Sequence, residues 1–307
     1  MQLAKDFPEL DWTVVASPED VARAVPGAAI YVTSNRTCHP ATGEALRRHG
    51  QALRWMHFTS AGIDRGIAMG IPDGLIVTNS AGLRAGNVSE HALMLLLALT
   101  RRLPNLLACQ RVHDWQRAEM TPHITSIEDA VVCVIGRGPI GGELARKLKG
   151  VNARPIAVSR TPDSDGIVEQ VFPRERLHDA LAIADAVAIC TAGDATSRHM
   201  IGAAEFTAMK PGALIVNVAR GSIIDEGALI AALREGRIAG AGLDVVATEP
   251  MPADNPLWDM PNVIVSPHVA GQGSSGYPGQ RRLFADNLAR FRAGEPMLNL
   301  CTVLARS

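Results

Sequence analysis

The chain has 307 residues, a length typical of two domains of about 150 residues each. Hydrophobic residues make up 47% and charged residues 20%, so the chain can bury a large core, which excludes disorder and a coiled coil. Its 30 Lys and Arg nearly balance 31 Asp and Glu, so there is no basic field to bind nucleic acid.

The spacing of the cysteines and the length of the apolar runs indicate in which cellular compartment the protein is expected. The five cysteines lie far apart with no C-x-x-C pair, which excludes a disulfide framework and a cysteine zinc cluster. No apolar run approaches the roughly 20 residues of a membrane span, and the first residues lack the pattern of a signal peptide. We expect a cytoplasmic protein with no nucleic-acid, membrane or metal partner.

The first hundred residues alternate short apolar segments with helical ones, which predicts βαβ units and a mainly parallel sheet. A helix should begin at Ser17, which is followed by a proline and two acidic residues. A second helix should cover residues 42–49. Strands are expected at 12–16, 29–33, 55–58 and 75–78.

A longer helix is expected next. Asn87 and Glu90 have the spacing of a capping box, and the run from Ala92 to Leu99 is apolar almost all round. Such a helix is buried on several sides, as one that crosses between domains or into a dimer partner would be. Pro104 should interrupt or kink it.

A second α/β segment begins near Ala130. It should end in an amphipathic helix over 280–292, preceded by a glycine-rich loop at 271–276. Its strands are expected at 131–135, 156–159, 186–190, 214–218, 240–245 and 263–266.

The strand at 131–135 leads into a G-x-G-x-x-G sequence that opens a helix, a pattern that predicts dinucleotide binding. The first glycine permits the tight turn, the second lets the pyrophosphate approach the backbone, and the third lets the helix pack closely on the strand. The helix N-terminus then offers N–H groups to phosphate. The residues are Gly136, Arg137, Gly138, Pro139, Ile140 and Gly141.

The end of the next strand predicts which dinucleotide is preferred. An NAD enzyme usually has an acidic residue about 20 residues after the glycines, where it binds the ribose 2′-OH. Here Ser159, Arg160 and Thr161 occupy that stretch. Arg160 can pair with a 2′-phosphate and no carboxylate repels it, so the sequence favours NADP(H), with NAD(H) as the alternative.

Three polar residues follow the carboxyl ends of later strands: Arg220, Glu249 and His268. Ligands bind outside the carboxyl ends of the strands in an open parallel sheet, so these side chains can converge on one site. A guanidinium suits a planar carboxylate, and an imidazole beside a carboxylate can transfer a proton near neutral pH.

The run from Met209 to Gly271 resembles the signature of the D-isomer-specific 2-hydroxyacid dehydrogenases, and among them the glyoxylate and hydroxypyruvate reductases. The loop at 60–64 and the helix from Asn87 are also similar to that family. The matching segments are Val216–Asp225, Gly242–Val245, Glu249-Pro250 and Ser266–Gly271.

This resemblance implies a fold and an activity. The fold is α/β, with a Rossmann dinucleotide-binding domain at 99–267 inserted in a smaller flavodoxin-like substrate domain made of 1–98 and 268–307. The activity is reduction of a small 2-oxo acid to the D-2-hydroxy acid with NADPH. The family also implies a homodimer.

The resemblance further implies roles for individual residues. Arg220 would bind the substrate carboxylate and polarise the 2-oxo group, and His268 would donate the proton while Glu249 holds its imidazole. Asp244 would contact the nicotinamide carboxamide. Backbone N–H groups of Ala61 and Gly62 would bind the substrate carboxylate.

Other interpretations remain open. Residues 192–198 depart from the Pro-Leu-Thr stretch of many relatives, so cofactor contacts at this loop are in doubt. One alternative is an NAD(H)-dependent enzyme with a different substrate, and another is a non-catalytic, cofactor-sensing corepressor. His57 and His91 are expected to be structural. Four residues are equally core or substrate-pocket candidates: Met56, Phe58, Trp115 and Tyr277.

Overall fold

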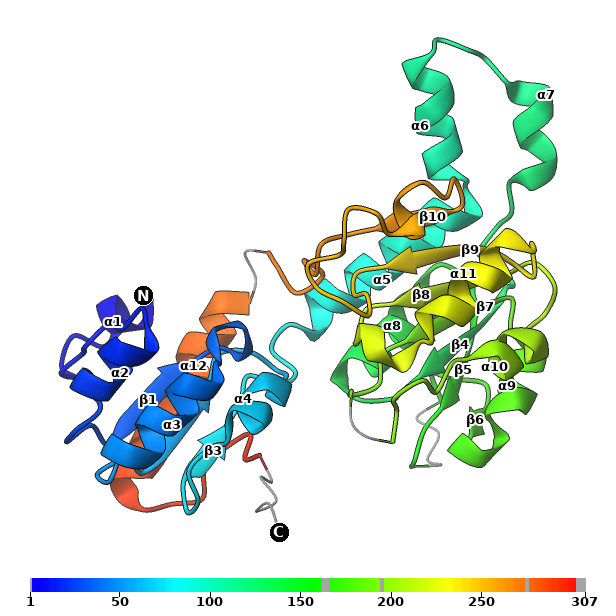
Figure 1. The fold of residues 1–307 in the computed structure, drawn as a ribbon. Helices are drawn as coiled ribbons and strands as arrows, with labels where there is room; N and C mark the ends of the chain where they lie inside the picture. Colours follow the sequence, from blue (N-terminus) through cyan, green and yellow to red (C-terminus); the bar gives the residue numbers. More distant parts are fainter. Residues whose placement is uncertain (1, 162–165, 194–195, 274–275, 302–307) are drawn as a thin grey trace. The chain divides into compact units, whose positions relative to one another are not determined.

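The computed structural model describes residues 2–161, 166–193, 196–273 and 276–301. The chain forms two compact units, the smaller made of Met1–Leu83 with Ser274–Ser307 and the larger of Arg84–Gly273 (Figure 1). These boundaries differ from those predicted at 98/99 and 267/268. Helix α5 (Ala85–Thr100) belongs wholly to the larger unit, because its apolar side chains pack on the larger sheet.

The smaller unit has a parallel sheet of three strands in the order β1-β2-β3. The strands are β1 (Ile30–Thr33), β2 (Trp55–Phe58) and β3 (Ile76–Thr78). Successive side chains of β2 enter different cores, as the alternation of a strand requires: Met56 packs with α2, α3 and α4, whereas Trp55 packs with α1 and α12. The helices are α1 (Gln2–Asp6), α2 (Pro18–Ala24), α3 (Pro40–His49), α4 (Asp64–Met69) and α12 (Gly276–Ala293).

The predicted helix start at Ser17 is confirmed, but the strand predicted at 12–16 is wrong. Ser17 caps α2 by accepting from Asp20 N, and the Asp20 side chain accepts in return from Ser17 N. Residues 12–16 pair with none of the three strands, and β1 has only β2 as its neighbour. Trp12 instead donates to Phe7 O and packs in the core without joining the sheet, whereas Val14 is exposed.

The larger unit has a seven-stranded parallel sheet in the order β10-β9-β8-β7-β4-β5-β6. Helices α5 and α8 cover one face and α9, α10 and α11 cover the other, so Val132 and Val134 lie in one core while Cys133 and Ile135 lie in the other. The α/β class and the parallel sheets are as predicted. The strands are β4 (Val131–Ile135), β5 (Arg154–Val158), β6 (Val171–Phe172), β7 (Ala186–Ile189), β8 (Ala213–Asn217), β9 (Ile238–Leu243) and β10 (Val263–Val265). The helices are α6 (Leu103–Arg111), α7 (Arg117–Met120), α8 (Pro139–Gly150), α9 (Leu177–Ile183), α10 (Ala203–Ala208) and α11 (Glu226–Arg234).

Helix α5 begins earlier than the sequence predicts. Its N-cap is Arg84, so Asn87 lies inside the helix and the predicted capping box is wrong. Pro104 lies in the first turn of α6, after a bend of 63° that separates α6 from α5. Within the described ranges no single helix is long and apolar enough to cross a membrane; α5 and α6 meet that test only together, across this bend.

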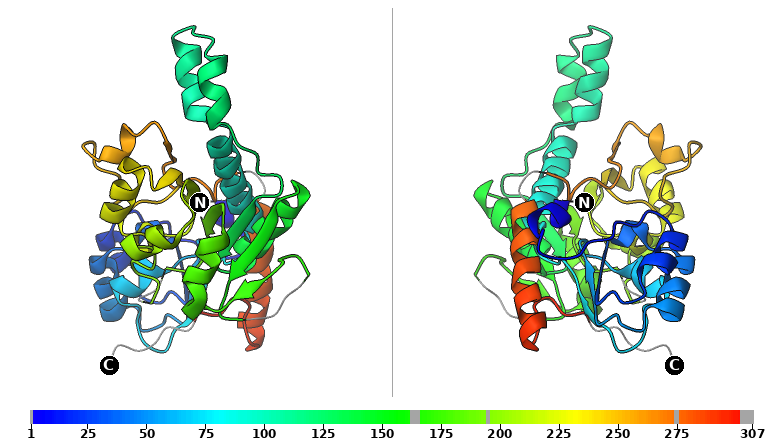
Figure 2. Two further views of the ribbon diagram at one scale, coloured as in Figure 1. Left: turned by 90° about the vertical axis from the view of Figure 1, so that its right-hand side faces the viewer. Right: turned by 90° about the vertical axis from the view of Figure 1, so that its left-hand side faces the viewer.

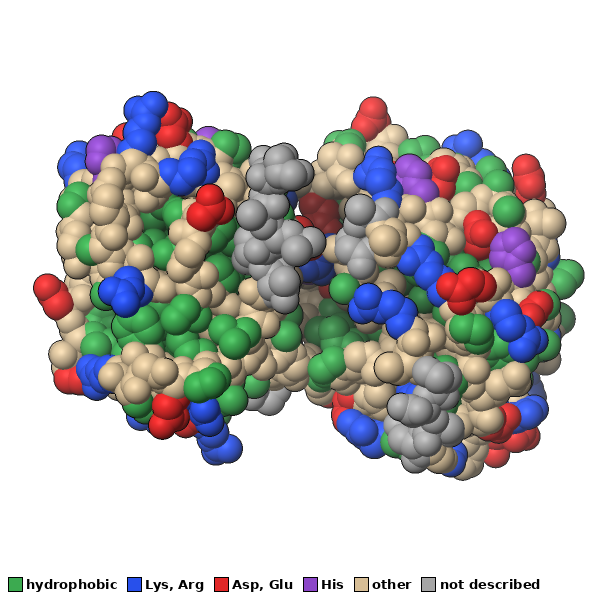
Figure 3. All heavy atoms as spheres, turned by 90° about the horizontal axis from the view of Figure 1, so that it is seen from below, with side chains coloured by type: hydrophobic (Ala, Val, Ile, Leu, Met, Phe, Trp, Pro, Cys, Tyr) green, Lys and Arg blue, Asp and Glu red, His purple; other side chains and the backbone are tan. Residues whose placement is uncertain are grey.

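Helices α6 and α7 lie side by side and project from the body of the larger unit (Figures 1 and 2). The side chains of this arm, defined here as residues 103–117, include several exposed apolar ones, among them Leu106, Leu107 and Trp115, which is 92% exposed. On the face drawn in Figure 3, Lys and Arg side chains are interspersed with Asp and Glu.

Candidate active site

The structure brings His268 and Glu249 into direct contact. His268 Nδ1 lies 2.8 Å from Glu249 Oε2, and both side chains are partly exposed. Burial alone would raise the pKa of Glu249, but the hydrogen bond from His268, the charge of His268 and the charge of Arg220 together lower it. Glu249 is therefore held as a carboxylate, and its contact with Nδ1 orients the imidazole ring of His268.

Arg220 follows β8 at the same carboxyl edge of the sheet. The buried side chain of Asn217 holds this turn by donating to Arg220 O and accepting from Ala219 N. A Cβ on Gly221 would lie 1.9 Å from Val246 O, so only glycine permits the turn to approach the segment that leads to Glu249. The positive charge of Arg220 also helps to lower the pKa of Glu249, so Arg220 lies in the neighbourhood of the His268–Glu249 pair in the larger unit.

The glycine loop between β4 and α8 has the geometry that the sequence predicts. Gly136 adopts a φ of 97°, and a Cβ on Gly141 would lie 1.9 Å from Gly136 O, so α8 packs tightly against the loop. Gly138 is the N-cap of α8, and a Cβ there would meet nothing within 4 Å. The open side of Gly138 and the first N–H groups of a 12-residue helix make a cradle that fits a pyrophosphate.

Ser159, Arg160 and Thr161 follow β5, the strand next to β4. Gly136 N donates to Val158 O, which ties the glycine loop to the end of β5. Ser159 Oγ accepts from Thr161 N, while the Arg160 side chain is exposed. The predicted cofactor residues therefore lie along one edge of the sheet.

Asp244 has partners that the sequence did not predict. Its side chain is only 2% exposed, and its carboxylate accepts from Ser266 Oγ, Val269 N and Ala270 N at 2.7, 2.9 and 3.0 Å. His91 Nε2 lies 2.8 Å from Ser266 Oγ. A hydroxyl two residues before His268 was the available sequence signal for this network.

Ala61 and Gly62 lie in the loop between β2 and α4 of the smaller unit. Asn79 Nδ2 donates to Ala61 O at 2.7 Å, and Ser60 Oγ donates to Gly62 O at 2.9 Å. The carbonyl groups of this loop are thus held by side chains of the same unit.

Among the four substrate-pocket candidates, Met56 and Phe58 are fully buried in the core of the smaller unit, so the structure gives no support for a place in a pocket. Trp115 lies on the arm, and the Tyr277 hydroxyl donates to Asp6. His57 is buried against Thr78 Oγ1 at 2.9 Å. In the loop that departs from the family pattern, Asp194 and Ala195 lie outside the described residues.

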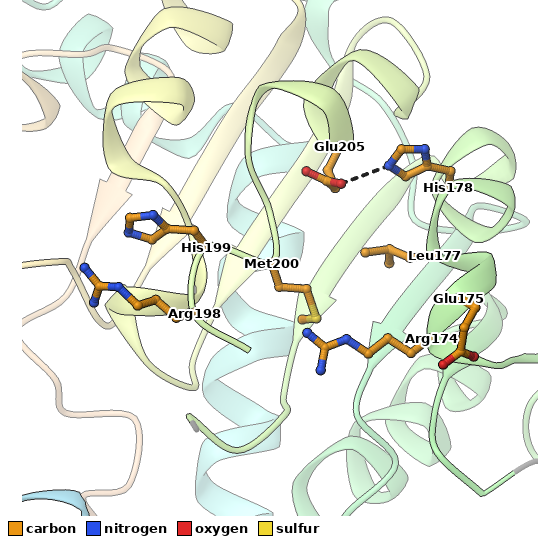
Figure 4. A pocket seen from close by; sticks show the side chains of 8 residues that line it. All are labelled: Arg174, Glu175, Leu177, His178, Arg198, His199, Met200 and Glu205. Atoms are coloured by element: carbon orange, nitrogen blue, oxygen red, sulfur yellow. Dashed lines mark hydrogen bonds and ion pairs between the residues drawn. The ribbon is translucent and has the colours of Figure 1, made fainter. Parts of the chain in front are cut away.

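A hollow of about 440 Å³ lies elsewhere on the larger unit (Figure 4). Arg174 and Arg198 are among the residues that line it, and His178 Nε2 lies 2.9 Å from Glu205 Oε1. None of the predicted catalytic or cofactor residues lines it.

Comparison with known proteins identifies the family. The model of the family described as D-isomer specific 2-hydroxyacid dehydrogenase, NAD binding domain, matches residues 93–270. The chain belongs to this family. The dehydrogenase is 35% identical to a glyoxylate reductase of Thermococcus gammatolerans over 72% of this chain and 68% of the relative. It is 29% identical to a glycerate dehydrogenase of Methylorubrum extorquens over 94% of this chain and 89% of the relative.

The solved structures agree with this assignment. The D-isomer specific 2-hydroxyacid dehydrogenase from Xanthobacter autotrophicus Py2, in complex with NADPH and MES, matches with a TM-score of 0.81 and 29% identity. The match covers 98% of this chain and 92% of that one. The resemblance seen in the sequence is confirmed, and the dehydrogenase is an NAD(P)-dependent enzyme of 2-oxo and 2-hydroxy acids with a Rossmann dinucleotide-binding fold.

Proposed function

We propose that the dehydrogenase uses NADPH to reduce a small 2-oxo acid of the glyoxylate or hydroxypyruvate kind to its D-2-hydroxy acid, with His268 as the proton donor. The observation that carries this proposal is the 2.8 Å contact between His268 Nδ1 and Glu249, with Arg220 close enough to act on the same carboxylate. The glyoxylate reductase relative supports the substrate class.

The cofactor fits the residues of the larger unit. Gly136, Gly138 and Gly141 would receive the pyrophosphate at the N-terminus of α8, and Arg137, Pro139 and Ile140 complete that loop. Asp244 remains the proposed partner of the nicotinamide carboxamide. When bound, the reduced nicotinamide supplies a hydride to the 2-oxo carbon.

The proton reaches the substrate oxygen from His268. Glu249 accepts from Nδ1, so the imidazole presents Nε2, and the protonated ring can donate as negative charge develops on the carbonyl oxygen. Glu249 stays ionised because its pKa is lowered, and it stabilises the charged ring before the transfer. In the reverse direction the neutral ring accepts the proton.

The substrate carboxylate is bound by cationic and backbone donors. The Arg220 guanidinium matches a planar carboxylate and stays charged at any working pH. Backbone N–H groups of Ala61 and Gly62 are the proposed second group of donors, on a loop that Asn79 and Ser60 hold.

Ser159, Arg160 and Thr161 support the preference for NADPH. The exposed Arg160 can pair with a ribose 2′-phosphate, and the hydroxyls of Ser159 and Thr161 can donate to it. The related Xanthobacter enzyme was crystallised with NADPH. Use of NAD(H) is the alternative.

The proposal includes a homodimer in the cytoplasm. Leu106, Leu107 and Trp115 on the arm are exposed apolar side chains that a second copy could cover. The five free cysteines support a reducing compartment.

The direct test is steady-state oxidation of NADPH with glyoxylate, hydroxypyruvate, pyruvate and phenylpyruvate, followed by chiral analysis of the product. We expect turnover of at least one of these acids, with the D-isomer as product where the product is chiral. Tight binding of NADPH without turnover of any acid would refute the reductase and favour the cofactor-sensing corepressor.

A further inference from the structure

The loop that carries His268 is held in a strained conformation. His268 has a φ of 54°, in the left-handed region that a residue other than glycine rarely adopts. Such a conformation is unfavourable and persists only where the surrounding contacts determine it strongly. The contacts around His268 therefore matter for where its imidazole lies.

Asp244 forms hydrogen bonds with His268 and with the residues on either side of it. Its carboxylate binds the side chain of Ser266 and the N–H groups of Val269 and Ala270, while its carbonyl oxygen accepts from His268 N at 2.9 Å. Because the hydroxyl proton of Ser266 points to Asp244, the same hydroxyl oxygen accepts from His91, whose Nε2 therefore carries a proton.

Helix α5 holds the same segment at two further points. Arg84 Nη1 donates to Gly271 O at 2.6 Å, and Asn87 Nδ2 donates to Gln272 O at 3.0 Å. Arg84, Asn87 and His91 have the spacing i, i+3 and i+7, which places them on one face of the helix. The opposite faces of α5 are apolar and fixed in the core, so the helix is a rigid support.

We propose that this polar face of α5 positions the catalytic loop, and that His91 acts through Ser266 and Asp244 as a positioning residue for His268. The inference rests on the proposed role of His268 in proton transfer. A misplacement of about 1 Å can cost 10²-fold in rate, so contacts that never touch the substrate can limit turnover.

Paired variants test this inference. Ser266→Ala and His91→Leu remove the bridge, whereas Ser266→Thr keeps the hydroxyl and His91→Gln keeps a donor. We expect the first two to lower kcat by about 10-fold or more while the Kd for NADPH, measured by fluorescence titration, changes by less than about 3-fold. The conservative variants should restore kcat to within about 3-fold of the wild type.

Two further variants separate positioning from folding. Ser89→Ala removes a buried hydroxyl of α5 that donates to Gly86 O within the same helix, so kcat should be unchanged. Asn87→Ala is favourable for a helix and should fold, yet it should lower kcat by about 3- to 10-fold.

Two results would overturn the positioning role: wild-type kcat in Ser266→Ala, His91→Leu and Asn87→Ala, or an equal loss in Ser266→Ala and Ser266→Thr. Absence of turnover in the wild type would instead refute the proposed function, so the two failures are distinguishable.

Discussion

At the scale of single residues, the proposed proton transfer depends on the contact between His268 Nδ1 and Glu249 Oε2, with Arg220 nearby. Arg220, Glu249 and His268 could be found because the carboxyl ends of neighbouring parallel strands meet at one edge. The partners of Asp244 could not be found, because hydrogen bonds between a helix and a distant loop leave no periodic pattern. His91 was expected to be structural rather than catalytic, and the partner that the structure gives it is Ser266, two residues before His268.

Glu249→Gln tests the role of the carboxylate at His268. Removing the negative charge removes an attraction for the protonated imidazole, so the basic limb of the pH–rate profile for reduction should move to lower pH by about one unit. The profile of kcat/KM from pH 5 to 9 measures this. A profile that superimposes on that of the wild type would make Glu249 a structural residue only.

Ser159→Asp and Arg160→Ala test the choice of cofactor. The new carboxylate should repel the 2′-phosphate and accept from the ribose 2′-OH, so Ser159→Asp should prefer NADH. A charge-assisted hydrogen bond contributes roughly 1.5–3 kcal/mol to binding. Arg160→Ala should therefore raise the Kd for NADPH by about 10- to 150-fold and leave the Kd for NADH unchanged. Measured dissociation constants for NADPH and NADH test both variants. An equal rise in the two constants in Arg160→Ala would show that Arg160 does not recognise the 2′-phosphate.

At the scale of elements, the strands buried inside the parallel sheets were predicted well. The segment at 12–16, which pairs with no described strand, and the very short strand β6 were not. Residues 131–135 match β4 because the whole segment is apolar and bounded by glycine. Residues 12–16 have strand composition but no partner strand, and β6 has only two residues, too few for a pattern. The start of α5 was misplaced because Asn87 resembles a cap, whereas its amide binds the loop at Gln272.

Gly141→Ala tests the packing of α8 on the glycine loop. A Cβ there would lie 1.9 Å from Gly136 O, so the helix must shift, and the Kd for NADPH should rise about 10-fold or more. Gly150→Ala is the matched control at the far end of α8, where a Cβ meets nothing within 4 Å. Equal affinities in the two variants would show that the close approach is not needed for cofactor binding.

At the scale of the whole molecule, the composition predicted two α/β units but not where they divide. The boundary near residue 84 depends on which sheet α5 packs against, and an all-round apolar helix does not reveal that from its sequence. The stability of the two units should also depend differently on pH, because the buried His57 lies in the smaller unit.

Burial lowers the pKa of His57 to about 4, so the folded protein holds this side chain neutral. The unfolded chain binds a proton near pH 6.5, so unfolding takes up a proton between pH 6.5 and 4, and stability falls as the pH is lowered through that range. The loss approaches about 3 kcal/mol. Urea unfolding followed by circular dichroism should show a shallower dependence on pH in His57→Gln, and an identical dependence in both proteins would contradict the assignment.

If the protein forms the proposed homodimer, we expect the arm to hold the two copies together. Replacing Leu106 and Leu107 with Lys places two charges in an apolar contact, which should yield monomers in light scattering. Val14→Lys, at an exposed apolar position of the smaller unit, is the control and should leave the dimer intact. A double variant that stays dimeric would locate the interface elsewhere.

The central claim is that His268, held by Glu249, gives the proton as the 2-oxo acid is reduced. The most direct test is the rate of NADPH oxidation with glyoxylate, measured side by side for the wild type and His268→Ala, with the Kd for NADPH determined for both. Removal of a positioned acid should lower kcat by about 10²–10⁴-fold while NADPH still binds. Wild-type turnover in His268→Ala would contradict the claim.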